Sequence, residues 1–136
     1  MTRVGKRVQA LIVHGDVGSL SALQNCMSGH GIRCVVARDL PTALLSMTQH
    51  TFDVAVVSSR LMEEGDGWPL AGVLHMVFPW AFISVIAPET SVVTLQAAIN
   101  HGVNAVYEPT ENVEALATEV VSAVMASQKA GGAPVN

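Results

Sequence analysis

The sequence is poor in charge, in aromatic side chains and in cysteine. Only 13% of its 136 residues are charged and 4% are aromatic, whereas 50% are hydrophobic. A core with so few aromatic residues must be built from Val, Ala, Leu, Ile and Met, and this composition is typical of a parallel sheet covered by helices. The length suits one domain with a core of its own.

Long apolar runs and basic stripes are also missing. No apolar run approaches the roughly 18 residues that a membrane-spanning helix requires, and the N-terminal segment has no cleavable small-residue site. The seven basic residues are scattered and the net charge is −4, so no stripe follows a phosphate backbone. Cys26 and Cys34 are the two cysteines of the sequence, and no second pair of cysteines accompanies them. This predicts free buried thiols. We expect a cytoplasmic protein without direct nucleic-acid or membrane contact.

Short β-branched segments alternate with segments of helical spacing along the chain. The predicted strands are 8–13, 34–37, 53–58, 82–87 and 104–108, and the predicted helices are 19–31, 40–50, 68–77, 91–102 and 111–128. Asp39 is the expected N-cap of the second helix. Because the connections are too long for hairpins, we predict an α/β fold with a doubly wound five-stranded parallel sheet and five helices.

In such a sheet, ligands bind beyond the carboxyl ends of the strands, where the strand order reverses. Ser58 ends the third predicted strand, and a nucleophilic serine there would need a base, for which His14 is the nearby candidate. A serine at a strand end also bonds readily to its own backbone. We prefer this structural interpretation and expect no catalytic residue and no enzyme activity.

Four short motifs in order carry a resemblance to a known family. They are LIVHGD at 11–16, FDVAVVS at 52–58, Asp66-Gly67, and GVNAVYEP at 102–109. Together they resemble the receiver domain of response regulators (CheY-like, flavodoxin-like) across roughly residues 7–127. The resemblance implies a receiver-like domain over 1–127 and a flexible tail or linker over 128–136.

The receiver family carries a phosphorylation site that this sequence lacks in several parts. Receivers hold Mg²⁺ on an acidic pair after the first strand and are phosphorylated on an aspartate after the third strand. A Ser or Thr follows the fourth strand, and a Lys-Pro pair follows the fifth. By resemblance, the acidic pair falls on His14 and Gly15 or on Gly15 and Asp16, and the acceptor on Ser58 or Ser59. The hydroxyl position falls on Ile86 or Ala87. The lysine position falls on Glu108, and Pro109 is retained, which implies a cis bond before it.

The resemblance therefore implies a degenerate, phosphorylation-independent receiver of two-component signal transduction, without metal or cofactor. Its partner would be an output domain, a histidine kinase or a second copy in a homodimer. Two alternatives stay open. One is a conventional receiver that uses Asp16 or Asp66 as a substitute group. The other is a small-ligand sensor that uses the acidic corner formed by Asp16, Glu63, Glu64, Asp66 and Glu108.

A protein–protein interface is expected near the predicted fourth helix and fifth strand. Tyr107 lies near the position where receivers place an aromatic residue that reports phosphorylation. The fourth helix carries more apolar residues than it can bury, so we predict an interface of Val92, Val93, Leu95, Ala97 and Tyr107. In contrast, we interpret Trp68, Phe78, Trp80 and Phe82 as core and edge filler, and Asp66 as the N-cap of the third helix, with Glu63 and Glu64 solvated.

Overall fold

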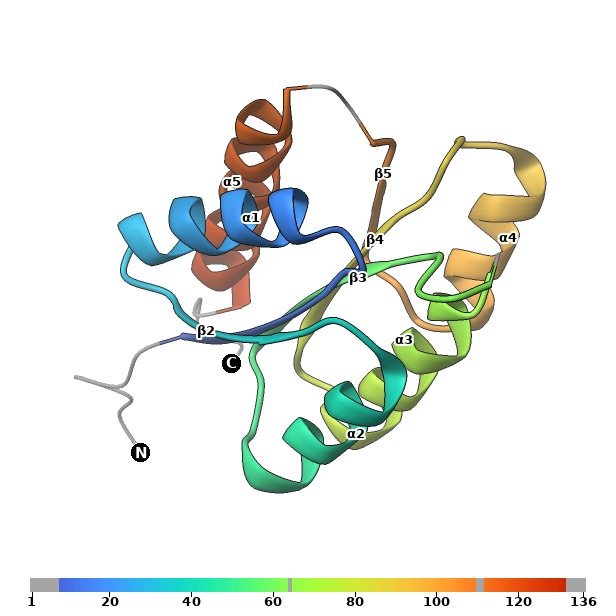
Figure 1. Cartoon of the computed structure of the whole chain (residues 1–136), viewed down its shortest axis with the longest axis horizontal. Coiled ribbons are helices and arrows are strands. Elements are labelled where there is room, and N and C mark those ends of the chain that lie inside the picture. The colour runs from blue at the N-terminus through green and yellow to red at the C-terminus, as the bar shows by residue number, and fades with distance from the viewer. Residues whose placement is uncertain (1–7, 64, 110–111, 132–136) are drawn as a thin grey trace.

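The computed structural model describes residues 8–63, 65–109 and 112–131, and these form one parallel sheet with helices on both faces (Figure 1). The strands are β1 (Gln9–Val13), β2 (Arg33–Ala37), β3 (Val54–Ser58), β4 (Phe82–Ile86) and β5 (Ala105–Tyr107). The helices are α1 (Val17–Gly29), α2 (Leu40–Gln49), α3 (Gly67–Val77), α4 (Val92–Asn100) and α5 (Val113–Gly131). The strand order β2-β1-β3-β4-β5 confirms the predicted doubly wound fold.

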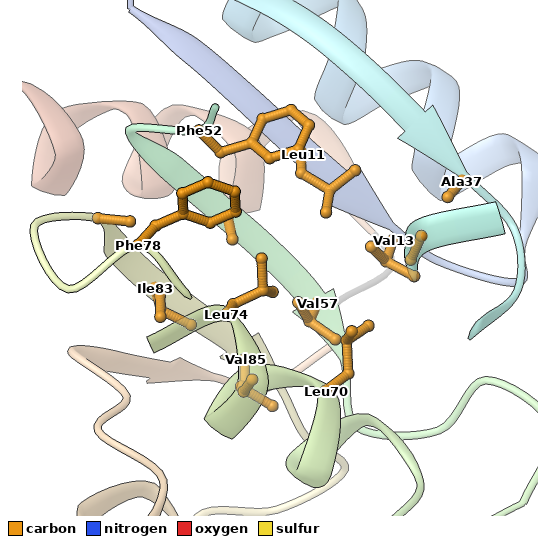
Figure 2. Close-up of a cluster of buried hydrophobic side chains, with 14 of the residues drawn as sticks. Leu11, Val13, Ala37, Phe52, Val57, Leu70, Leu74, Phe78, Ile83 and Val85 are labelled. Atoms are coloured by element: carbon orange, nitrogen blue, oxygen red, sulfur yellow. The ribbon is translucent and has the colours of Figure 1, made fainter. Parts of the chain in front are cut away.

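Alternating apolar side chains bury both faces of the sheet. Leu11, Val57 and Val85 point toward α2 and α3, where Leu74 packs against them (Figure 2). The opposite face is covered by α1 and α5. The predicted helix faces are confirmed, because Leu20, Leu23, Met27, Leu116, Val120, Val121 and Val124 are all buried. The side chain of Val113, also predicted to be buried, lies outside the described part of the chain.

Local signals in the sequence set several of the helix ends. Asp39 caps α2, because its carboxylate accepts a hydrogen bond from the Thr42 amide at 2.8 Å, as predicted. Helix α5 continues to Gly131, beyond the expected end at Gln128. The remainder of the expected tail, 132–136, lies outside the described residues. None of the helices in the described ranges is long and apolar enough to cross a membrane.

The aromatic residues after the third strand divide between different surroundings. Phe78 is buried beside α3, and its ring meets that of Phe52 edge-on at 5.7 Å between centroids. Trp68 packs partly against the same core cluster, whereas Phe82 packs on the opposite face of the sheet. Trp80 remains 58% exposed. Three of the four residues therefore fill core or edge positions, whereas Trp80 is mostly exposed and packs its ring edge-on against Phe78 at 5.7 Å between centroids.

The two cysteines are free, as predicted, and each is half-buried. Burial raises the pKa of the Cys34 thiol above its ordinary value. The thiol is therefore held in its less reactive, protonated form at neutral pH.

Helix α3 begins in direct contact with the end of β3. A Cβ atom on Gly67 would lie 2.9 Å from both the Ser58 carbonyl carbon and the Ser59 Cα, and closer still to the Ser58 carbonyl oxygen. The Gly67 amide also donates to the Ser59 carbonyl at 2.9 Å. Only glycine lets the first turn of α3 approach this backbone so closely.

Ser84 places an unpaired hydroxyl in the core. Its side chain is fully buried in β4, and its Oγ has no hydrogen-bond partner among the described residues. Ser84→Ala should raise the free energy of unfolding by about 1 kcal/mol, because a buried hydroxyl without a partner keeps its desolvation cost. Urea denaturation measures this. Ser58→Ala is the matched control. It should lower the free energy of unfolding, because the Ser58 hydroxyl is buried but hydrogen-bonded. Equal destabilisation by both variants would show that the Ser84 hydroxyl is satisfied.

Candidate functional site

A cavity of about 560 Å³ opens at the carboxyl edge of the sheet, between the loops that follow β1 and β3. The strand order reverses at this point, because β1 pairs with β2 on one side and with β3 on the other. This is where doubly wound sheets bind ligands. Seven of the predicted positions line the cavity: His14, Gly15, Asp16, Ser58, Ser59, Ile86 and Pro109.

Two of the predicted positions are not brought into this cavity. Ala87 lies in a neighbouring hollow toward α4, which it shares with Ser59. Glu108 is exposed, and its carboxylate accepts a hydrogen bond from the Thr90 amide at 2.9 Å, in the loop before α4. The implied cis bond before Pro109 is wrong, because no cis peptide bond occurs in the described chain. The trans isomer is the lower-energy form wherever the turn does not demand cis.

Asp16 acts as the N-cap of α1. Its carboxylate accepts hydrogen bonds from the Ser19 amide at 2.9 Å and from the Ser19 hydroxyl at 2.8 Å. These bonds, the hydroxyl first, hold the pKa of Asp16 below its ordinary value. The carboxylate is therefore ionised at neutral pH and already committed to the helix end.

His14 is held in one tautomer by the same loop. The Asp16 amide donates to the His14 Nδ1 at 3.0 Å, so the neutral ring carries its proton on Nε2. Burial lowers the pKa of His14, and the charge of Asp16 opposes this only in part. At neutral pH the ring is therefore an uncharged donor on the cavity wall.

The Ser58 hydroxyl closes a turn of its own backbone. Its Oγ donates to the Arg60 carbonyl at 2.8 Å and accepts from the Arg60 amide at 3.3 Å. Within the described residues, no hydrogen bond joins Ser58 to His14. Ser59 is also buried, and its amide donates to the Ile86 carbonyl at 2.8 Å. Both serines therefore anchor the loop to the sheet.

Asp66 does not cap α3, which corrects the prediction. Its carboxylate accepts from the amides of Leu61 at 2.6 Å, Met62 at 2.8 Å and Glu63 at 3.0 Å. Asp66 itself has a helical backbone, and its side chain makes no bond to the α3 amides. Burial works to raise the pKa of Asp66, but the backbone hydrogen bonds outweigh it and lower the pKa. Glu63 is exposed, and Glu64 lies outside the described residues.

The acidic corner suggested by the sequence is therefore dispersed. Asp16, Asp66 and Glu108 each accept hydrogen bonds from backbone amides of their own surroundings. Over the described ranges, no group of three or more His, Cys, Asp or Glu side chains is placed to share a metal ion.

Sequence reasoning did not assign a role to Arg60, although it lines the cavity. Its side chain is exposed, and no hydrogen bond or ion pair of its guanidinium occurs within the described part of the chain. The sequence does predict its place at this edge of the sheet, because Ser58 to Arg60 lie at and just beyond the end of a central strand.

The predicted interface residues differ in exposure. Val92 and Val93 are 80% and 78% exposed, and Leu95 is 46% exposed. Ala97 and Tyr107 are half-buried. Burial, and next the charge of Glu119, raise the pKa of the Tyr107 phenol above its ordinary value. Ile99, which was not predicted, is 79% exposed on the same helix.

Solved structures of receiver domains share this fold. A CheY-like receiver domain protein from Methanospirillum hungatei superposes with a TM-score of 0.77 at 18% identity, covering 91% of this chain and 98% of that one. An orphan response regulator of H. pylori gives 0.72 at 12% identity, with 86% and 96% covered. A Burkholderia pseudomallei response regulator, solved with a phosphorylated aspartic acid, a calcium ion and citrate, gives 0.72 at 20%, with 95% and 77% covered.

No protein-family model matches the sequence, and the comparison with curated proteins found no match. At these identities the structural likeness establishes the CheY-like fold.

Proposed function

We propose that this chain is a receiver-like signalling module that is not phosphorylated and acts through protein–protein contacts. The observation that carries this is the end of β3, where Ser58 replaces a carboxylate and closes its hydroxyl on the Arg60 backbone. A receiver needs a free carboxylate there, with a metal and a cation to offset the phosphoryl charge. Here Asp16 is bound to Ser19, and the residue before Pro109 is Glu108.

The surface of α4 supports a contact function. Its exposed Val92, Leu95 and Ile99 follow one another at helical spacing and form an apolar stripe. Neither α3 nor α4 contains Asp, Glu, Lys or Arg. The desolvation of charged groups therefore costs little free energy when a partner covers α4. A second copy of the chain presents the same uncharged helix.

The partner that we propose first is a second copy of the chain. An output domain and a histidine kinase are the other candidates. The proposal places the protein in the cytoplasm, where both free cysteines stay reduced, and involves no direct nucleic-acid or membrane contact.

We expect the chain to dimerise without any phosphodonor, with a Kd of about 1–10 µM. Val92→Glu should weaken the dimer at least about tenfold, because a charge would be buried in an apolar contact. The fold should tolerate it, since the side chain is 80% exposed and an acidic residue suits a helix N-terminus. Sedimentation velocity across concentrations measures the effect, and added acetyl phosphate should change neither the association nor the intact mass.

Leu45→Glu is the matched control, because Leu45 is an exposed leucine on α2, away from α4. It should leave the dimer unchanged. A monomer at every concentration contradicts the homodimer, and a dimer that responds only to Leu45→Glu moves the contact to α2. An acetyl phosphate adduct on the unchanged protein contradicts the proposed function itself.

A further inference from the structure

We propose that the cavity between β1 and β3 binds a small oxyanion rather than a divalent cation. The oxyanion is a free anion or the phosphate or carboxylate end of a small organic molecule. This goes beyond the proposed function, because a module that signals through protein contacts needs no ligand here. The inference rests on which polar groups around the cavity are already engaged and which are not.

The carboxylates around the cavity are engaged. Among the described residues, Asp16 is the only acidic residue on its wall, and its Oδ2 accepts both hydrogen bonds from Ser19 at the start of α1. Asp66 is bound to three loop amides, and Glu108 to the Thr90 amide outside the cavity. Mg²⁺ and Ca²⁺ prefer several free oxygen ligands, so the wall is poor in what a hard cation needs.

The groups that remain unengaged are donors. Arg60 lines the cavity, and its guanidinium has no partner within the described chain. His14 carries its proton on Nε2, and no bond from that atom occurs among the described residues. Arg38, in contrast, is already engaged at the rim, where its Nη2 donates to the Gly15 carbonyl at 3.3 Å. Guanidinium and imidazole N–H groups are the donors that recognise carboxylates, sulfate and phosphate.

The balance of charge agrees with this assignment. Among the described residues, the charged groups at the cavity are Arg60 and Asp16, whose carboxylate is hydrogen-bonded to Ser19, with Arg38 at the rim close to Asp39. His14 adds a positive charge when it takes up a proton. The cavity volume of about 560 Å³ exceeds what a single sulfate fills, so an organic tail on the anion also has room.

The test is calorimetric titration of the whole chain with sodium sulfate, against sodium chloride at matched ionic strength. We expect saturable binding with a Kd on the order of 1 mM. Arg60→Ala should weaken it about tenfold, as expected for the loss of a charged donor. Arg33→Ala is the matched control, because Arg33 is exposed at the amino end of β2, the opposite edge of the sheet, and should bind as the unchanged chain does.

The pH dependence gives a second readout. Sulfate should bind more tightly at pH 5.5 than at pH 7.5, because His14 gains a positive charge as the pH falls toward its pKa, which burial holds below the ordinary value. Sulfate keeps its charge over this range. His14→Asn should remove the difference, because the Asn oxygen can still accept from the Asp16 amide but the Asn amide takes up no proton over this pH range.

Phenyl phosphate separates the two sources of the anion. Tighter binding than sulfate assigns the cavity to an organic phosphate, and equal binding assigns it to a free anion. The proposal is overturned by the absence of saturable sulfate binding, by an equal loss in Arg60→Ala and Arg33→Ala, or by a micromolar Mg²⁺ site. Because dimerisation is measured without sulfate, failure here leaves the proposed function standing.

Discussion

Gly67→Ala should lower the free energy of unfolding by about 3 kcal/mol. The added methyl group would meet backbone atoms of Ser58 and Ser59, at 2.9 Å or less. Backbone cannot rotate away as a flexible side chain can, so α3 must shift away from β3. That shift also stretches the hydrogen bond from the Gly67 amide to the Ser59 carbonyl. The midpoint of urea unfolding, at constant m-value, measures the loss.

Gly29→Ala is the control, because a Cβ at the last residue of α1 meets nothing within 4 Å. Helix propensity predicts that this variant is unchanged or more stable by up to about 1 kcal/mol. If Gly67→Ala were as stable as Gly29→Ala, α3 would not be pressed against the site loop. The geometry assigned to the Asp66-Gly67 motif would then be incorrect.

Ser58→Asp alone should not create a receiver that accepts phosphate. The new carboxylate supplies a nucleophile but no second acid for Mg²⁺ and no lysine before Pro109. Each missing electrostatic group in such a site costs about a hundredfold or more in rate. We expect phosphorylation from acetyl phosphate to be at least about a thousandfold slower than in a rebuilt site. Intact mass, with an adduct of about 80 Da, follows the reaction.

The rebuilt site combines Ser58→Asp with Gly15→Asp, Ala87→Ser and Glu108→Lys. A Cβ at Gly15 would lie 3.3 Å from the Leu61 carbonyl oxygen, so the added acid requires only a small shift of the loop. Ser58→Asn, which is similar in size but not nucleophilic, is the control for each background. Equal rates for the single and the fourfold variant would show that the lost groups do not limit phosphorylation.

The fold could be predicted because its signals are local. Each strand is a short β-branched run, and Leu20, Leu23 and Met27 have the spacing of one buried helix face. Asp39 was identified as a cap because a cap bonds to an amide three residues away. These features depend on neighbours in the sequence, so they can be predicted without knowledge of the tertiary structure.

The position of the candidate site could be predicted from the sequence, but the hydrogen-bond partners of its carboxylates could not. The strand ends predicted where His14 and Ser58 would meet, because the topology places β1 beside β3. The partner of each carboxylate depends on loop conformation, which no periodicity encodes. Asp66 was assigned to α3 for this reason, although it bonds to the loop before it. For the same reason, the sequence did not predict that the Glu108 carboxylate bonds to the Thr90 amide.

The closed turn of Ser58 also bears on how such a module could be controlled. A ligand shifts a conformational equilibrium only when it binds the two states with different affinity. Under the proposed function, in which the Ser58 hydroxyl stays bonded to the Arg60 backbone, no covalent modification at this position supplies that difference. Under the proposed function, output then follows mass action, so the cell would set the signal through the amount of protein made and degraded. An anion that prefers one arrangement of the Arg60 loop would be the remaining means of biasing it.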